Sequence, residues 1–225
     1  MQKTLAEKKV KYSYGPYNKV KGDEQWIRIT EGCPNQCPYC YEPPEIRIFP
    51  TPEIVRNEVK IIDMNLLCKP EAATIIRDLA NRRVDGKVVH YELTCGVDYR
   101  YLTQEYADLL KISRFKNMRI AWDGPYVVQT YIKNAIDRLK KAGYASRDIM
   151  VFIICNHSDN YEDNLKKLDL CKVWGVAAAD CYFDNQTSPN IIPVRWKKDQ
   201  IKDFRKKVRK HNQLINFGID PEVYI

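Results

Sequence analysis

The sequence predicts an α/β fold in the form of an open six-stranded partial (β/α)6 TIM-like barrel. Six short apolar runs of strand length alternate with six helix-like segments along most of the chain. One strand and one helix together take about 30 residues, which is typical of a βα unit and predicts a parallel sheet with its helices outside. The 225 residues are fewer than the roughly 250 typical of eight closed units. An open doubly wound sheet is the alternative prediction.

Each predicted strand is a short apolar run, and most are rich in β-branched or aromatic residues. The six predicted strands cover residues 24–30, 61–67, 87–94, 118–123, 148–155 and 176–183. Parallel strands end at one rim of a barrel or sheet, and ligands bind at that rim. We therefore expect the functional residues directly after the strands.

The predicted helices are recognised by their start signals, stop signals and apolar stripes. Segment 51–60 opens with Thr51 and Pro52, a pair typical of an N-cap and first turn. Segment 125–142 places its apolar residues on one face and is followed by Gly143, which favours a helix end. The six predicted helices cover residues 51–60, 70–82, 103–113, 125–142, 160–175 and 197–217.

The composition predicts one domain with a basic segment at each end. The chain is 44% hydrophobic, which is enough for one buried core. We divide it into a basic N-terminal arm at 1–22 and a single domain at 23–225 that includes a basic C-terminal helix. No run of about 18 apolar residues is present, so no membrane partner is expected. The N-terminus lacks a secretory signal, so we expect a cytoplasmic protein.

The net charge of +8 is concentrated at the two ends of the chain. Residues 1–22 carry six lysines against one glutamate, and residues 195–225 carry nine Lys and Arg against four Asp and Glu. The middle of the chain is close to neutral. One interpretation is that the basic ends are solvated surfaces. The alternative is that they bind an anionic partner, either a nucleic acid or an acidic redox protein.

Three cysteines follow the first predicted strand closely. Cys33, Cys37 and Cys40 have the spacing C-x₃-C-x₂-C, and the chain has eight cysteines in all. In a reducing compartment, clustered thiols indicate a metal site or catalysis. A structural zinc site usually takes four ligands as two pairs, and no second pair exists here. A four-iron cluster held by three thiolates keeps one iron open for another ligand.

The motif C-P-N-Q-C-P-Y-C, after the first strand of a βα-repeat chain, resembles that of the radical S-adenosylmethionine superfamily, and the likeness extends over about residues 24–217. It implies a [4Fe–4S] cluster on Cys33, Cys37 and Cys40, with S-adenosyl-L-methionine on the fourth iron. One electron from a flavodoxin- or ferredoxin-type donor would release a 5′-deoxyadenosyl radical that abstracts a substrate hydrogen. An oxygen-sensitive enzyme is expected; a zinc or simple electron-transfer site is the alternative.

The resemblance also suggests contacts to S-adenosylmethionine. Tyr39, the aromatic residue before the third cysteine, would lie by the adenine. Where family members often have Gly-Gly-Glu, this chain has Asp63-Met64-Asn65. Asp63 and Asn65 alternate with Met64, so we expect them to face the same way and bind the ammonium and carboxylate of the methionine. A capping or backbone role is the alternative for both residues.

Polar residues after the third and fourth strands are further candidates. Arg100 is suited to a bidentate grip on the methionine carboxylate, with Asp98 on the same side. An Asp–Arg surface pair is the alternative. Asp123 would hold the ribose hydroxyls. Ile153 on the fifth strand would pack against adenine, with core packing as the alternative. Cys95 is a catalytic candidate as a hydrogen-atom donor or covalent ligand, and a buried thiol without function is the alternative.

The sequence leaves the substrate open. A small molecule or nucleotide is slightly favoured, because the chain carries little beyond the predicted catalytic core. An RNA- or protein-modifying enzyme is the alternative reading of the same motif. A prediction of another class is a non-enzymatic zinc- or iron–sulfur-binding module whose basic ends bind nucleic acid.

Overall fold

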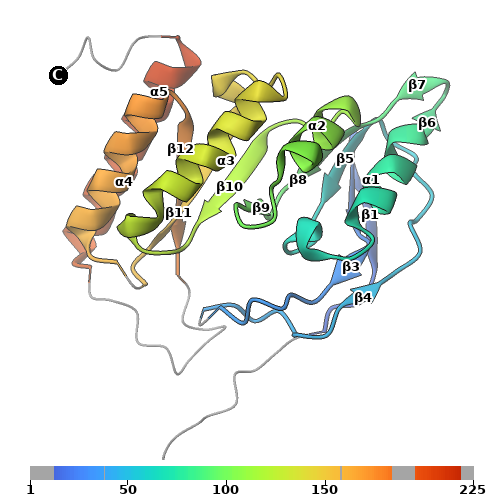
Figure 1. Cartoon of the computed structure of the whole chain (residues 1–225), viewed down its shortest axis with the longest axis horizontal. Coiled ribbons are helices and arrows are strands. Elements are labelled where there is room, and N and C mark those ends of the chain that lie inside the picture. The colour runs from blue at the N-terminus through green and yellow to red at the C-terminus, as the bar shows by residue number, and fades with distance from the viewer. Residues whose placement is uncertain (1–12, 38, 158, 184–195, 219–225) are drawn as a thin grey trace, which may run out of the picture.

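The computed structural model describes residues 13–37, 39–157, 159–183 and 196–218. Its strands form a mixed α/β fold with two four-stranded sheets, ordered β1-β2-β5-β8 and β12-β11-β10-β9 (Figure 1). Two short antiparallel pairs, β3-β4 and β6-β7, complete the strands. The strands are β1 Tyr17–Lys21, β2 Glu24–Arg28, β3 Thr30–Glu31, β4 Arg47–Ile48, β5 Glu58–Ile61, β6 Arg83–Val84, β7 Lys87–Val88, β8 His90–Leu93, β9 Val97–Asp98, β10 Met118–Trp122, β11 Ile149–Cys155 and β12 Ala177–Tyr182.

The described residues form five α-helices, of which all but the last lie on one side of the strands, while the last packs along the edge strand β12 (Figure 1). They are α1 Ala72–Asn81, α2 Gln104–Ile112, α3 Gln129–Lys141, α4 Tyr161–Trp174 and α5 Lys198–Asn216, with short 3-10 turns at η1 Leu66–Cys68, η2 Tyr126–Val128 and η3 Ser146–Asp148. A doubly wound sheet would carry helices on both faces. The one-sided arrangement therefore favours the barrel-like prediction over its alternative.

The six predicted strands correspond to β2, β5, β8, β10, β11 and β12, which pair in parallel within each sheet. Among the described residues no strand ladder joins β8 to β10; the isolated bridge Tyr91–Phe115 lies just before β10, and Arg119 of β10 reaches Glu92 and the Leu93 carbonyl of β8. A continuous six-stranded barrel therefore stays a prediction. The sequence analysis did not foresee β1, which pairs antiparallel with β2 and includes part of the predicted arm. Residues 1–12 of that arm lie outside the described residues.

The predicted helix at 51–60 is wrong. Residues 51–57 form no helix, and β5 occupies Glu58–Ile61. The buried side chain of Gln25 explains the difference, because its Nε2 donates to Glu53 O at 2.8 Å and its Oε1 accepts from Val55 N at 2.8 Å. These bonds satisfy backbone groups that a helix would otherwise pair. The second strand consequently begins and ends earlier than the predicted 61–67.

The helix boundaries elsewhere follow local capping. The Thr103 side chain accepts from Tyr106 N at the start of α2, and the Asn160 side chain accepts from Asp163 N at the start of α4. Gly175 ends α4 in the left-handed conformation with φ 68°. No helix among the described residues is long and apolar enough to cross a membrane.

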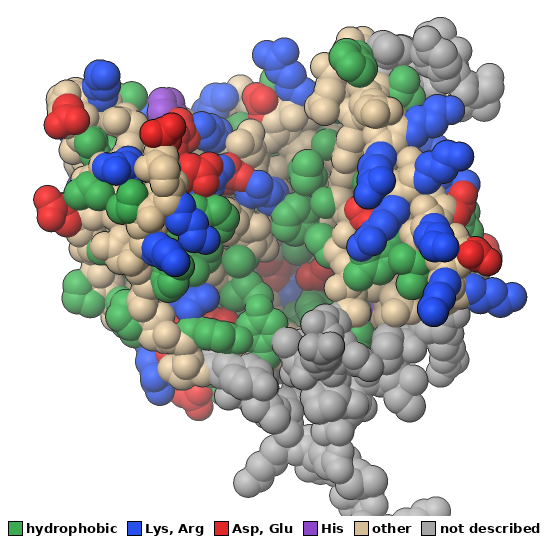
Figure 2. Space-filling model, turned by 180° about the vertical axis from the view of Figure 1, so that it is seen from behind, with side chains coloured by type: hydrophobic (Ala, Val, Ile, Leu, Met, Phe, Trp, Pro, Cys, Tyr) green, Lys and Arg blue, Asp and Glu red, His purple; other side chains and the backbone are tan. Residues whose placement is uncertain are grey.

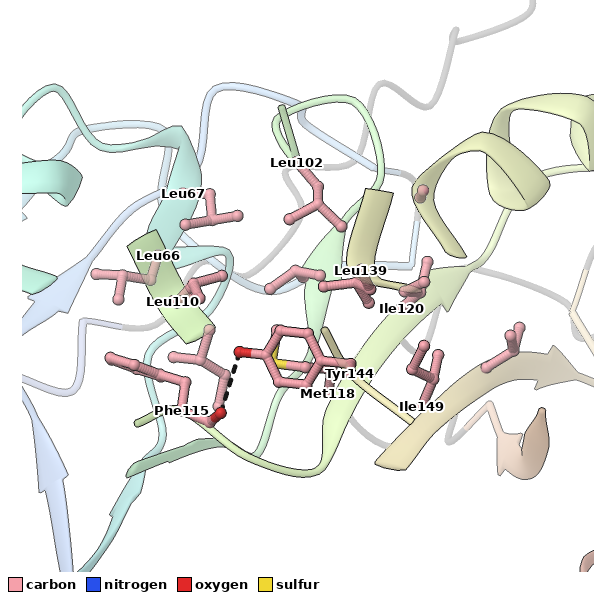
Figure 3. Close-up of a cluster of buried hydrophobic side chains, with 14 of the residues drawn as sticks. Leu66, Leu67, Leu102, Leu110, Phe115, Met118, Ile120, Leu139, Tyr144 and Ile149 are labelled. Atoms are coloured by element: carbon pink, nitrogen blue, oxygen red, sulfur yellow. Dashed lines mark hydrogen bonds between the residues drawn. The ribbon is translucent and has the colours of Figure 1, made fainter. Parts of the chain in front are cut away.

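The hydrophobic core lies between the sheets and the helices (Figure 3). Leu110 of α2 and Leu139 of α3 pack there with Met118, Ile120 and other buried side chains from the strands. A buried hydroxyl is accommodated by a hydrogen bond from Tyr144 Oη to the carbonyl of Phe115 at 3.0 Å. This core covers the face of the strands that is turned toward the helices.

Candidate functional site

The cysteine loop begins with a backbone crossing that only glycine allows. Gly32 has φ +89°, and a Cβ there would lie 2.0 Å from the carbonyl oxygen of Glu45. The Glu42 carboxylate accepts from Gly32 N at 2.6 Å, and the buried Lys69 ammonium donates to the Gly32 carbonyl. Cys33 N donates to Pro43 O at 2.8 Å, which closes the loop. The loop runs past the carboxyl ends of the strands (Figure 1).

The three cysteines of the motif line one cavity of about 290 Å³. Loops after the second, third and fourth predicted strands supply the rest of its wall. The structure thus brings together most of the residues that the sequence singles out. The predicted site residues in this wall are Cys33, Cys37, Tyr39, Cys40, Asn65, Cys95, Asp98, Arg100 and Asp123.

The surroundings of Cys33 favour the thiolate. The pKa of the Cys33 thiol falls to about 5, chiefly because the Cys68 thiol donates a hydrogen bond to it, with further help from Asn65 and the Lys69 charge. Asn65 Nδ2 lies 3.5 Å from Cys33 Sγ. The same contact raises the pKa of Cys68, so Cys68 stays protonated as the donor. A thiolate is the form that binds metal.

This donor set fits an iron–sulfur cluster. Three thiols line one cavity, and the surroundings of Cys33 lower its pKa. Within the described residues, no three or more His, Cys, Asp or Glu are grouped as a single ion would need. A cluster spreads its cysteine ligands over different irons, so it does not require that grouping. Cys33, Cys37 and Cys40 are the residues that would hold it.

Asn35, which lies between the first two cysteines, ties the loop to the third predicted strand. Its Nδ2 donates to Asp98 Oδ2 at 2.7 Å, and its Oδ1 accepts from the Tyr101 hydroxyl at 2.9 Å. Arg100 grips the same Asp98 carboxylate, with Nη2 at 2.5 Å from Oδ2 and Nε at 2.8 Å from Oδ1. Arg100, the group predicted for the methionine carboxylate, is thus engaged with Asp98, which favours the alternative of an Asp–Arg pair. Asp98 also serves as an anchor for the cysteine loop.

Tyr39 makes a second tie from the loop to the sheet. Its hydroxyl donates to Asp123 Oδ2 at 2.8 Å, and its ring lies edge-on to His157 with centroids 5.1 Å apart. Burial, with the nearby Asp123 charge, raises the pKa of Tyr39, so the hydroxyl stays a donor. Burial also raises the pKa of Asp123. Burial likewise raises the pKa of Cys95, which disfavours its thiolate.

Two predicted site residues lie elsewhere. Asp63 is 1% exposed and accepts from Ile29 N at 3.0 Å, whereas Met64 and Asn65 line the cavity. The expectation that Asp63 and Asn65 face the same way is therefore wrong, because residues 62–65 form no strand. Ile153 belongs to the core, which favours its core-packing alternative.

The strand that carries Ile153 contributes its neighbours to a second cavity of about 290 Å³. Side chains alternate between the two faces of a strand, so Phe152 and Ile154 point to the side opposite Ile153. This cavity shares part of its wall with the first one. Its lining residues are Tyr39, Tyr41, Cys95, Ala121, Asp123, Phe152, Ile154, Cys181, Tyr182 and Phe183.

Sequence reasoning missed three groups that shape the site. In the sequence, Asn35 is a spacer between two cysteines of the motif, Cys68 is an isolated cysteine, and Lys69 belongs to no motif. The signal for Asn35 was its place inside the motif. Cys68 and Lys69 gave no such signal, because only the turn at Leu66–Cys68 brings them to Cys33 and Gly32.

Comparison with solved structures places this arrangement among known folds. The radical S-adenosylmethionine methyltransferase TsrM from Kitasatospora setae, with tryptophan substrate and the analogue aza-SAM bound, matches with a TM-score of 0.56 and 13% identity over 71% of this chain. The same enzyme with cobalamin and a [4Fe–4S] cluster bound matches with a TM-score of 0.55 and 12% identity over 70% of this chain. The chain has the fold of radical S-adenosylmethionine enzymes.

This likeness covers part of the larger enzyme. The match spans 36% of each TsrM chain. Coproporphyrinogen III oxidase (HemN) from Escherichia coli, described as a radical SAM enzyme, matches with a TM-score of 0.49 and 10% identity over 70% of this chain and 40% of its own. No protein-family model and no curated protein matches the chain.

Proposed function

We propose that the protein is a radical S-adenosylmethionine enzyme that holds a [4Fe–4S] cluster on Cys33, Cys37 and Cys40. The observation that carries this proposal is the placement of all three thiols in one cavity wall, at the strand ends of a fold shared with such enzymes. Cys33 is already favoured as a thiolate. The bound cluster supplies reductive cleavage of S-adenosylmethionine and the hydrogen abstraction that follows.

The other residues of the cavity bind S-adenosylmethionine and orient it. Asn65 carries a buried Oδ1 that has no hydrogen-bond partner within the described part of the chain, so it accepts a donor such as the methionine ammonium. Tyr39 and Asp123 hold the loop and face the nucleoside. Arg100 reaches the methionine carboxylate by turning from Asp98, to which it is now bound. A flavodoxin- or ferredoxin-type protein supplies the electron.

The substrate lies in the second cavity, beside the cluster. Its wall is mainly aromatic and aliphatic, and Cys95, Ala121 and Asp123 line both cavities. An apolar wall with few polar groups suits a small molecule or a nucleotide base. The tryptophan substrate bound to TsrM is an aromatic molecule of the kind that such an apolar wall would suit. Cys95 and Cys181 both line the second cavity, but only Cys95 of these two also lines the first. Cys95 is therefore the thiol placed between the cofactor and the substrate.

The test is anaerobic reconstitution with iron and sulfide, followed by S-adenosylmethionine and dithionite. We expect about four irons per chain, and we expect 5′-deoxyadenosine by mass spectrometry. The triple variant Cys33→Ala, Cys37→Ala, Cys40→Ala loses both iron and product. Cys171→Ala is the matched control, because it removes a fully buried thiol from the core.

Each result decides between the proposals. Product from the wild type and the control, but not from the triple variant, supports the enzyme. Zinc without iron in the reconstituted wild type would contradict it and favour the non-enzymatic metal-binding alternative. A four-iron protein that forms no 5′-deoxyadenosine with dithionite would contradict the catalytic part while leaving the cluster assignment intact.

A further inference from the structure

Helix α5 carries a strongly basic outer face. Its 19 residues include seven Lys and Arg against two Asp. Its inner face is fixed to the edge strand β12, where Asn212 donates to Ala178 O at 2.7 Å and accepts from Ala178 N at 2.9 Å. Phe204 and Val208 are buried on that side. The cations therefore project outward from a rigid support.

Four of these cations form a stripe that lacks ion-pair partners among the described residues. Arg205 pairs with Asp180 at 3.2 Å and Lys207 with Asp203 at 2.7 Å, but no carboxylate pairs with the stripe. The stripe follows the spacing of neighbouring helical turns and consists of Lys202, Lys206, Arg209 and Lys210. Figure 2 shows Lys and Arg side chains gathered on this flank of the molecule.

The stripe lines a shallow depression of about 570 Å³ together with Arg205 and Gln213, and none of the described residues in that wall is acidic. A second depression of about 430 Å³ adjoins it toward α4 and adds Lys172 and Lys207, along with two carboxylates and three leucines: Asp169, Asp203, Leu165, Leu168 and Leu214. Like charges one helical turn apart repel each other and destabilise a helix. A bound polyanion would relieve this repulsion.

The composition of the surface distinguishes between anionic partners. Protein interfaces have an apolar centre and are depleted in lysine. Among the described residues, the first depression has no hydrophobic lining residue, and the leucines of the second depression lie outside the stripe. An acidic protein would therefore find no apolar centre on the stripe itself. A nucleic-acid backbone is recognised by lysines and arginines without such a centre. We propose that the outer face of α5 binds the phosphodiester backbone of a nucleic acid.

The test measures binding of fluorescein-labelled 20-mers of single-stranded RNA (U20) and DNA (dT20) to the full chain, by anisotropy between 50 and 300 mM salt. A variant replaces the four stripe cations, Lys202, Lys206, Arg209 and Lys210, with Gln. The control variant makes the same charge change on the opposite flank, at Lys19, Lys21, Arg56 and Lys87. Thermal unfolding checks that both variants fold.

Single-stranded nucleic acid loses about 0.7 in the slope of log K against log salt for each phosphate contact removed. We therefore expect the stripe variant to lower the slope by about 3 and to weaken binding at 100 mM salt by at least about tenfold. The control variant should bind nearly as well as the wild type. RNA and DNA should bind similarly, since the proposed contacts go to the backbone.

Three results would overturn the proposal: no binding of either 20-mer at 50 mM salt, a slope that the stripe variant leaves unchanged, or equal weakening by the control variant. Competition by polyglutamate as effective as by U20 would also overturn it, in favour of an acidic protein. The binding assay uses the protein without added iron, so its failure is distinct from failure of the proposed enzymatic function.

Discussion

Asn35 is the side chain that ties the cysteine loop most directly to the sheet. Replacing it with Ala leaves Tyr101 and Asp98 each without one partner. We expect the free energy of unfolding of the cluster-free protein to fall by about 1 kcal/mol. We also expect the loaded protein to lose iron faster to a chelator, because the loop between the first two ligands becomes more mobile.

The matched control is Gln104→Ala, which likewise removes an amide with two partners, Asp108 and the Arg138 carbonyl, but far from the cysteine loop. Iron release would be followed by absorbance of the chelator complex under anaerobic conditions. Equal release rates for the wild type, Asn35→Ala and Gln104→Ala would show that the tie has no part in holding the cluster loop.

Asp63 gives the protein a specific pH dependence. Burial raises the pKa of Asp63 to about 6 from an ordinary value of 3.8, although Ile29 N donates to it. Between about pH 4 and 6 the folded state therefore holds a proton that the unfolded state releases. Its contribution to stability is present below about pH 4 and is lost as the pH rises through 6.

This change in unfolding free energy is about 3 kcal/mol, because the pKa rises by about 2 and each pKa unit corresponds to about 1.4 kcal/mol. Asp63→Asn cannot titrate, so the difference in unfolding free energy between wild type and variant should change by about that amount from pH 4 to pH 7. Urea unfolding at several pH values measures it. Parallel curves for the two proteins would contradict the raised pKa.

At the scale of elements, the turn from β3 into the cysteine loop depends on Gly32. In Gly32→Ala the new Cβ would meet the Glu45 carbonyl, and the backbone would be strained at φ +89°. We expect a loss of about 3 kcal/mol or more in unfolding free energy, with poor cluster incorporation. Chemical denaturation and iron analysis measure the two effects.

Gly86→Ala separates the cost of backbone strain from the cost of the clash with the Glu45 carbonyl. Gly86 has φ +73°, but an added Cβ would meet nothing within 4 Å. Only the backbone strain remains there, so we expect a cost of about 1 to 2 kcal/mol and normal iron content. Equal costs for both variants would mean that the crowding at Gly32 is absorbed by movement of Glu45.

At the scale of the whole molecule, Glu92 connects the two sheets. It lies on β8 with 2% of its side chain exposed, and it pairs with Lys60 of β5 and Arg119 of β10. Hydrogen bonds from Lys60 and Asn117 and the Arg119 charge lower its pKa despite burial. Its stabilising charge is therefore present at neutral pH and is lost on strong acidification.

Glu92→Gln leaves Arg119 without an ion-pair partner among the described residues and Lys60 with only the longer pair to Glu24 at 3.6 Å, so we expect the unfolding free energy to fall by about 3 kcal/mol. Asp137→Asn is the control, since it breaks an exposed pair with Lys133 on α3 and should cost less than about 1 kcal/mol. Urea denaturation at pH 7 compares them. Similar small losses in both variants would show that the charges do not hold the sheets together.

The sequence by itself determined the features that depend on local pattern. The spacing of Cys33, Cys37 and Cys40 is covalent and needs no tertiary contact. The apolar runs and capping signals predicted most strands and the helices α1 to α5, because periodicity and caps act within a few residues. The α/β fold with parallel sheets followed from the order of these elements.

Only the tertiary structure decided what depends on contacts between distant segments. The Gln25 side chain hydrogen-bonds the backbone of Glu53 and Val55. These bonds prevent the helix that Thr51 and the residues after it predict. The apolar run of β11 has the same pattern on both faces, so it could not show that Phe152 and Ile154, rather than Ile153, face the cavity. Asn35 meets Asp98 across 63 residues of sequence, a contact that no local pattern records.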